Sequence, residues 1–237
     1  MLATVGSLQV PYILMHMQSI EKLLEYLYYR NIDTIRSTGI RLTTPQRSEI
    51  TILTQQQIQL LFTTTSKETE SPLNEALNAR DRAMLVIYYS CGLRRNEGIH
   101  VNTDDINFDR RILHVRKGKN YKERFVPFNK TNSHYLQQWI YDYRPQFLKG
   151  KKEHRLFINV NGNPMIGGTL YSRLKQLQRA TEDLSLNEKT IGLHTLRHSI
   201  ATHLLQAGMS LERISQFLGH SSLDSTQIYT HLKEEPL

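Results

Sequence analysis

The sequence contains a single cysteine, Cys91, so no disulfide can form within the chain. A lone thiol is typical of proteins that work in a reducing compartment. No run of about 18 apolar residues occurs, which excludes a membrane-spanning helix. No basic residue precedes Lys22, so the N-terminus lacks the charged segment of a secretory signal peptide. These absences predict a cytoplasmic protein.

Acidic residues are also in short supply relative to basic ones. The chain of 237 residues has 30 Lys and Arg against 22 Asp and Glu, a formal net charge of +8. Such an excess is typical of a protein with a polyanionic partner, and nucleic acid is the commonest one. Internal repeats and low-complexity tracts are missing as well, which excludes a repeat architecture.

What is present is mostly helical patterning. Apolar residues recur at helical spacing in several segments, while β-rich runs are confined to the middle of the chain. The predicted helices span 18–32, 53–65, 79–93, 134–148, 168–184, 194–207 and 210–218, with another from near Ser222. The predicted strands are a hairpin, 110–118 with 121–128, and a short strand within 154–165. The pattern indicates a mainly α fold with a small antiparallel β-sheet (α+β), preceded by a helix and a polar linker around 36–51.

The segment "HTLRH" places His194 and Arg197 on one helix face, because residues three apart are neighbours there. His194 and His198 also have the spacing of two metal ligands. The glutamate of a zincin helix is missing, however, and Arg197 would repel a cation. An imidazole beside a guanidinium suits an anion, and a phosphate best of all. The alternative is a helix N-terminus with a surface arginine.

Two other segments carry groups of the same kind. In "CGLRRNEG", Arg94 and Arg95 follow Gly92, which ends an apolar helix, and Glu97 is spaced to pair with one of the two arginines. In the hairpin, basic residues cluster closely enough to enter a DNA groove. These are Arg116, Lys117, Lys119, Lys122 and Arg124. For both segments the alternative is an ordinary solvated surface.

Tyr229, set among Ser, Thr and His in "LGHSSLDSTQIYTHL", completes a set suited to one reaction. Two arginines neutralise the oxygens of a phosphodiester, and a histidine and a lysine move protons. The tyrosine is the nucleophile. Its pKa of about 10 in water requires nearby cations for attack at neutral pH.

The segment 193–232 resembles the C-terminal block of the tyrosine recombinase (phage-type integrase) family, in its Xer-like branch. His-x-x-Arg, Leu-Gly-His and Tyr-Thr-His follow in the family's order and spacing. "ARDRAMLVIYYSCGLRRNEG" resembles the block with the family's first catalytic arginine, and "VRKGKNYKERFVPF" resembles the hairpin with its catalytic lysine. The resemblance implies the family's catalytic domain fold over about 50–232.

The resemblance also implies roles for individual residues. Arg94, His194 and Arg197 bind and activate the phosphate, and His220 completes that pocket and assists proton transfer. Tyr229 attacks to form a 3′-phosphotyrosyl bond, and Lys119 protonates the leaving 5′-oxygen. The usual hairpin has Gly-Lys-Gly where this chain has "KGKNYK", so Lys117 and Lys122 remain alternatives to Lys119.

Residues 1–50 are interpreted as a helical remnant of a core-binding (SAM-like) domain plus linker, and 51–237 as the catalytic domain. The expected partner is double-stranded DNA, bound by a homo-oligomer (a tetramer) or with a partner recombinase, and no metal or nucleotide is expected. Arg95, Arg116, Lys117, Lys122 and Arg124 are the expected DNA contacts. The alternatives are a truncated, non-catalytic DNA-binding regulator of a full-length recombinase and a type IB topoisomerase.

Overall fold

The computed structural model describes residues 10–40, 50–67, 69–116 and 123–219. The chain divides into two compact units, Met1–Glu49 and Ile50–Leu237. The helix predicted to carry Tyr229 lies outside the described residues.

The first unit contains one long helix, α1 (Val10–Tyr29). It begins eight residues before the predicted start at 18, with Pro11 in the first turn, where a missing N–H is tolerated. The chain then folds back along it, since Glu21 accepts a hydrogen bond from the Thr38 amide at 2.9 Å. The guanidinium of Arg36 lies over the ring of Tyr28, 4.7 Å from its centroid. The interpretation of this unit as a remnant of a core-binding domain stays a prediction.

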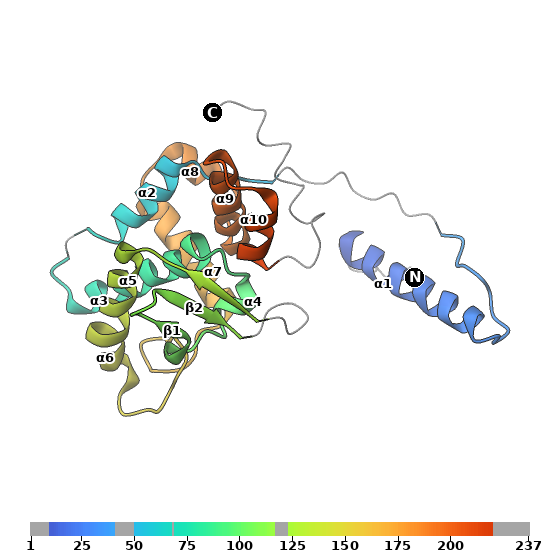
Figure 1. The fold of residues 1–237 in the computed structure, drawn as a ribbon, viewed down its shortest axis with the longest axis horizontal. Coiled ribbons are helices and arrows are strands. Elements are labelled where there is room, and N and C mark those ends of the chain that lie inside the picture. The colour runs from blue at the N-terminus through green and yellow to red at the C-terminus, as the bar shows by residue number, and fades with distance from the viewer. Residues whose placement is uncertain (1–9, 41–49, 68, 117–122, 220–237) are drawn as a thin grey trace, which may run out of the picture. The chain divides into compact units, whose positions relative to one another are not determined.

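The second unit is mainly helical, as predicted (Figure 1). Its helical elements in chain order are α2 (Gln55–Thr64), α3 (Pro72–Leu85), η1 (Val86–Ser90), α4 (Arg95–Gly98), η2 (Thr103–Asp105), α5 (Lys130–Gln137), η4 (Gln138–Tyr143), α6 (Arg144–Leu148), α7 (Gly167–Ala180), α8 (Leu184–Glu188), α9 (Leu193–Gln206) and α10 (Leu211–Leu218). Each predicted helix that falls in the described part of this unit is present, with ends shifted by a few residues. The short elements α4, η2 and α8 were not predicted.

The predicted hairpin strands are present as neighbouring strands of a small sheet. Strands β1 (Ile106–Asn107), β2 (Ile112–Val115) and β3 (Arg124–Pro127) pair antiparallel in that order. Leu113 pairs with Val126, and both side chains point into the core, whereas His114 and Phe125 stack on the other face. The connection between β2 and β3 lies outside the described residues. The predicted mainly α fold with a small antiparallel sheet is confirmed.

The prediction of a strand within 154–165 is wrong. This stretch makes only isolated bridges, Asn102 with Arg155 and Ile158 with Pro164. The chain folds back on itself, so Met165 donates to Phe157 at 2.9 Å across a turn at Gly162. Leu156, Phe157, Ile158 and Met165 are buried because the loop lies against the core, and burial by itself gives the same sequence pattern as a strand.

One large apolar core holds most of these elements together, and a smaller apolar cluster lies between α9 and α10. Trp139, Tyr88, Leu61 and Leu113 are among the fully buried side chains of the large core. The indole N–H of Trp139 donates to the carbonyl of Leu156 at 2.9 Å, which satisfies its one polar atom. Helix α3 and η1 run through this core, with α9 against η1 and α10 against α9 and β3.

A wide π-helical turn, η1, continues α3 up to the loop with Arg94. The Cys91 amide donates to the carbonyl of Val86 at 2.8 Å, a bond that spans five residues. Such a turn accommodates one more residue than an α-helical turn, and π-turns are frequent at functional sites. Gly92 follows with φ of +60°, in the left-handed conformation predicted for a residue that ends a helix.

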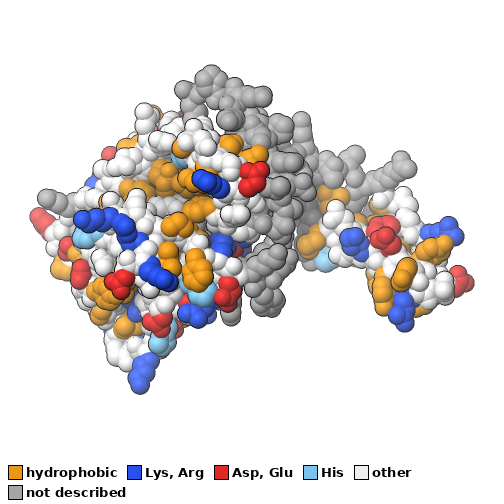
Figure 2. Space-filling model, in the orientation of Figure 1, with side chains coloured by type: hydrophobic (Ala, Val, Ile, Leu, Met, Phe, Trp, Pro, Cys, Tyr) orange, Lys and Arg blue, Asp and Glu red, His pale blue; other side chains and the backbone are white. Residues whose placement is uncertain are grey.

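On the face shown in Figure 2, the basic side chains of the second unit do not form one continuous patch. There, Lys and Arg side chains are interspersed with Asp and Glu, and hydrophobic side chains lie between them. The net positive charge of the sequence therefore does not locate a DNA-binding surface on this face. No helix among the described residues combines the length and the apolar character needed to cross a membrane.

Candidate active site

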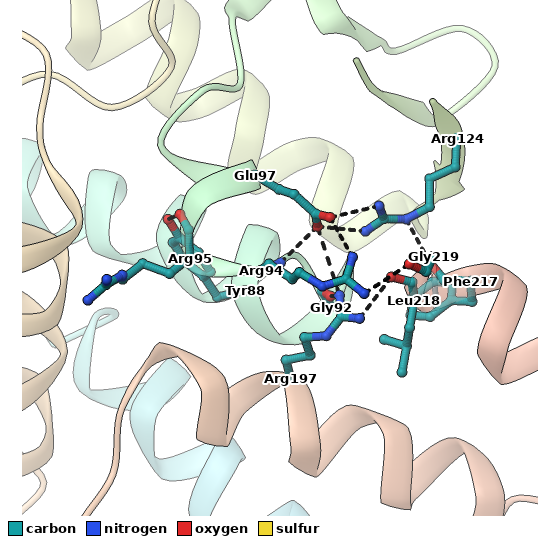
Figure 3. A network of polar contacts seen from close by, with 10 residues as sticks. All are labelled: Tyr88, Gly92, Arg94, Arg95, Glu97, Arg124, Arg197, Phe217, Leu218 and Gly219. Carbon is teal, nitrogen blue, oxygen red and sulfur yellow. Dashed lines mark hydrogen bonds and ion pairs between the residues drawn. The ribbon is translucent and has the colours of Figure 1, made fainter. Parts of the chain in front are cut away.

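Glu97 lies at the centre of the polar cluster in Figure 3, and its side chain is only 3% exposed. Burial by itself would raise the pKa of Glu97. The hydrogen bonds and charge of Arg124, with the bonds from Arg94, outweigh burial and lower this pKa to about 2. Glu97 is therefore a permanent anion that organises the cations around it.

Arg94 is held at the start of α4 by Glu97, three residues later in the chain. The backbone N–H of Arg94 donates to Glu97 Oε2 at 2.9 Å, and Nη1 donates to Oε1 at 2.7 Å. The predicted pairing of Glu97 with one of the two arginines is therefore present, and that arginine is Arg94. Arg94 keeps 22% of its side chain exposed.

Arg197 reaches the same cluster from the first turns of α9. Its Nη1 donates to the carbonyl of Gly92 at 2.6 Å and lies 3.9 Å from Glu97 Oε2. Its Nη2 donates to the carbonyl of Leu218 at 2.8 Å. With a side chain 4% exposed, Arg197 is fixed by packing and hydrogen bonds together. The structure thus brings Arg94 and Arg197 to one place, as the sequence predicted.

Arg124 is the third arginine of the cluster, and its surroundings differ from those of an exposed hairpin residue. It was expected to contact DNA with the rest of the basic hairpin, but only 10% of its side chain is exposed. Its Nη1 and Nη2 donate to the two oxygens of Glu97 at 3.1 and 2.8 Å, a bidentate pair. Its Nε donates to the carbonyl of Phe217 at 3.0 Å. The buried carboxylate attracts the guanidinium inward, away from solvent.

The C-terminal end of α10 is where these arginines converge. Three consecutive carbonyls, those of Phe217, Leu218 and Gly219, accept hydrogen bonds from Arg124, Arg197 and Arg94 in turn. The last carbonyls of a helix lack partners within it and carry partial negative charge, so cations are favoured there. Gly219, with φ of +66°, ends α10 as predicted and turns its carbonyl towards Arg94.

The charges of this cluster do not cancel. Three guanidinium groups share one carboxylate, Glu97, which leaves an excess of two positive charges among these four groups. Carbonyl dipoles stabilise the arginines but add no net charge. A site of this kind has an electrostatic preference for an anion with several oxygens, such as a phosphate diester.

His194 lies beside the cluster, at the first turn of α9. Partial burial of its ring and the charges of Arg197, Arg95 and Arg94 lower the pKa of His194. Burial and the charges of His194 and Arg197 lower the pKa of the neighbouring His198 to about 4. Both rings are therefore neutral at pH 7, and a neutral imidazole can accept a proton.

These histidines predict a loss of stability in mild acid. His198 has a folded-state pKa of about 4 against 6.5 unfolded, so the unfolded chain takes up the proton first as the pH falls through 6.5. Stability therefore decreases with falling pH, by roughly 2 kcal/mol between pH 7 and pH 5 for this one group. The pKa of Glu97 is lowered from 4.5, so its contribution is retained down to pH 4.5 and is lost only below it.

Urea unfolding at pH 7, 6 and 5 measures this effect. The variant His198→Gln, which cannot titrate, should lose less stability than the wild type over that range. An equal loss in the two proteins would show that His198 does not keep a lowered pKa in the folded state.

The other predicted site residues lie at the rim or outside the described residues. Arg95 is exposed and points away from the cluster, and Arg116 is half-exposed and paired with Asp105. Five residues lie outside the part of the chain that the structure describes, and their roles stay predictions: Lys117, Lys119, Lys122, His220 and Tyr229.

The backbone carbonyls at the end of α10 are the part of the site that sequence reasoning missed. Gly219 signalled that a helix ends there, but no local signal indicated which cations donate hydrogen bonds to the carbonyls at that end. The pairing of Arg124 with Glu97 joins residues 27 apart in the chain, so it too had no local signal. Among the described residues, no group of three or more His, Cys, Asp or Glu is placed to hold a metal ion.

Comparison with known proteins identifies the family. The model of the phage integrase family matches residues 51–235, most of the chain. This chain belongs to the phage integrase family. Among curated members, the tyrosine recombinase XerD of Pseudomonas putida is 39% identical over 165 residues, which cover 70% of this chain and 54% of XerD. XerD of Staphylococcus aureus is 38% identical over 170 residues, 71% of this chain and 56% of that protein.

Solved structures of recombinases share the fold. XerH bound to its palindromic difH substrate in a post-cleavage complex has a TM-score of 0.75 at 23% identity, over 98% of this chain and 66% of XerH. The XerA recombinase has a TM-score of 0.66 at 25% identity, over 92% of this chain and 72% of XerA. The present chain spans about half the length of the curated relatives it matches.

Proposed function

We propose that this phage integrase family member is a site-specific DNA recombinase or integrase that cuts and rejoins DNA strands through a covalent bond to Tyr229. The observation that carries the proposal is the convergence of Arg94 and Arg197 beside a single buried carboxylate, which leaves positive charge in excess. A scissile phosphate is an anion with oxygens that match two guanidinium groups. The curated relatives named above are tyrosine recombinases, and XerH was solved with its DNA substrate.

The proposed reaction is a transesterification that conserves the phosphodiester bond. The phenolic oxygen of Tyr229 attacks phosphorus, a tyrosyl–phosphorus bond forms and the bond to the 5′-oxygen breaks. The phenol proton is transferred to a base, either His194, whose ring is neutral, or His220. Lys119 delivers a proton to the 5′-oxygen. A 5′-hydroxyl from another strand reverses these steps. No metal or nucleotide is needed, because the bond energy is kept in the phosphotyrosine.

The arginines act on the charge that grows at phosphorus. Arg94 and Arg197 are already oriented by Glu97 and by backbone carbonyls, so little reorganisation is needed as the charge develops. Preorganised donors of this kind contribute roughly 10²–10³ in rate each. Arg95, Arg116, Lys117 and Lys122 bind neighbouring phosphates of double-stranded DNA. The active species is a homo-oligomer on DNA, a tetramer, or an assembly with a partner recombinase.

Covalent capture of DNA tests the proposal without knowledge of the target. The tagged chain is expressed in a bacterial host that carries the candidate DNA element, purified under denaturing conditions, and any attached DNA is sequenced. DNA that ends at one sequence supports a site-specific recombinase. Bound but uncut DNA would favour a non-catalytic DNA-binding regulator, and relaxation of plasmid without a preferred site would favour a type IB topoisomerase.

A further inference from the structure

We propose that Arg124 is a positioning residue, which holds the end of α10 against the two phosphate-binding arginines and does not itself contact DNA. The inference rests on the proposed function. Arg124 is the first residue of β3, and the hairpin with the candidate lysines directly precedes that strand. Helix α10 is followed directly by His220 in the chain. One guanidinium thus connects segments that the reaction needs together.

The contacts of Arg124 join three separate parts of the fold (Figure 3). Its Nη1 and Nη2 bind both oxygens of Glu97, and Glu97 in turn orients Arg94. Its Nε binds the carbonyl of Phe217, next to the carbonyls that bind Arg197 and Arg94. All three nitrogens of the guanidinium are engaged, and a planar fork is needed to reach both acceptors.

The close approach of Arg124 to Gly219 also supports a positioning role for this arginine. A Cβ at Gly219 would lie 2.8 Å from Nη1 of Arg124 and 3.0 Å from its Cδ and Cζ. Any side chain there would therefore displace the guanidinium or the end of the helix. The left-handed φ of +66° also favours glycine, but asparagine tolerates that conformation well. The two requirements can be separated by substitution.

Arg124→Lys tests the contact, because lysine keeps the charge but is a compact donor that cannot reproduce the fork. In the free protein, we expect the last-turn amides of α10 to exchange hydrogen at least tenfold faster. On a duplex of the sequence captured by the wild type, cleavage at saturating DNA should fall about 10- to 100-fold. The DNA Kd and its salt dependence should stay within about twofold, because no phosphate contact is lost.

Two control variants show the results expected from loss of a buried guanidinium fork elsewhere and from loss of a phosphate contact. Arg144→Lys removes a similarly buried guanidinium fork that binds the carbonyls of Glu153 and Arg155, away from α10. It should lower the Tm without faster exchange in α10. Arg116→Ala should show the pattern of a phosphate contact, with a raised Kd and a salt slope smaller by about one.

The substitutions Gly219→Asn and Gly219→Ala complete the test. Both add a Cβ against Arg124, whereas only alanine is strained at this φ. We expect both variants to show the fast exchange and slow cleavage of Arg124→Lys. The effects of Gly219→Asn and Arg124→Lys should not multiply when combined, since they disturb one contact.

Separate results overturn the inference and the proposed function. Three results for Arg124→Lys would each overturn the positioning role: unchanged exchange in α10, cleavage at the wild-type rate, or the raised Kd and smaller salt slope expected of a lost phosphate contact. Wild-type behaviour of Gly219→Asn would also overturn it. Absence of a covalent adduct with the wild-type protein would instead overturn the proposed function. The exchange measurement is made without DNA, so it tests the contact of Arg124 in either case.

Discussion

Replacing Tyr229 with phenylalanine is expected to abolish the covalent DNA adduct while leaving the DNA Kd within about twofold. The substitution removes one hydroxyl and keeps the ring, so only the nucleophile is lost. Loss of a nucleophile typically lowers turnover by roughly 10⁴-fold or more, below the detection limit of adduct trapping. The measurement is denaturing capture of DNA, with binding followed separately by a gel-shift titration.

Tyr141→Phe is the matched control, since Tyr141 is an exposed tyrosine of η4 in the same unit, 61% accessible. It should form adducts like the wild type. Adducts that persist in Tyr229→Phe would identify another nucleophile. Loss of DNA binding together with adducts would instead assign Tyr229 a structural role.

Replacing Arg197 with alanine should slow cleavage by about 10²–10³-fold or more, because a preorganised donor to the phosphate is removed. The same change leaves the carbonyls of Gly92 and Leu218 without their donor. Each unsatisfied buried carbonyl costs about 1–3 kcal/mol, so a lower Tm is expected as well. Single-turnover cleavage well below the Tm separates the two effects.

Arg197→Lys serves as the second variant for this test. It keeps the positive charge beside Glu97 and limits the loss of stability. Its single ammonium cannot bind both carbonyls and a phosphate at once, so cleavage should remain slow. Near-normal cleavage by either variant would remove Arg197 from the phosphate site.

Much of the fold could be predicted because its elements have strong local signals. The spacing of apolar residues located α9, and Ser210 and Gly219 marked the start and end of α10. The stretch 154–165 was misassigned because a buried loop and a buried strand share one apolar pattern. Helix α8 has only five residues, too few for a periodic signal.

The candidate site likewise has one part that the sequence could predict and another that it could not. Arg94 and Glu97 are three residues apart, so their pairing is a local property that the sequence could indicate. Arg124 received the role of its basic neighbours because its partner Glu97 comes from another segment. Long-range electrostatic pairing decides which arginine of a basic run is buried, and a single sequence contains no record of that pairing.

The π-helical turn η1 limits the insertions and deletions that the site can accept during evolution. An α-helix rotates by about 100° for each residue, so the extra residue of a π-turn changes the direction in which all later residues leave the helix. Arg94 lies beyond that turn. A one-residue insertion or deletion within Val86–Ser90 would therefore turn Arg94 and Glu97 together away from Arg197 and from the end of α10.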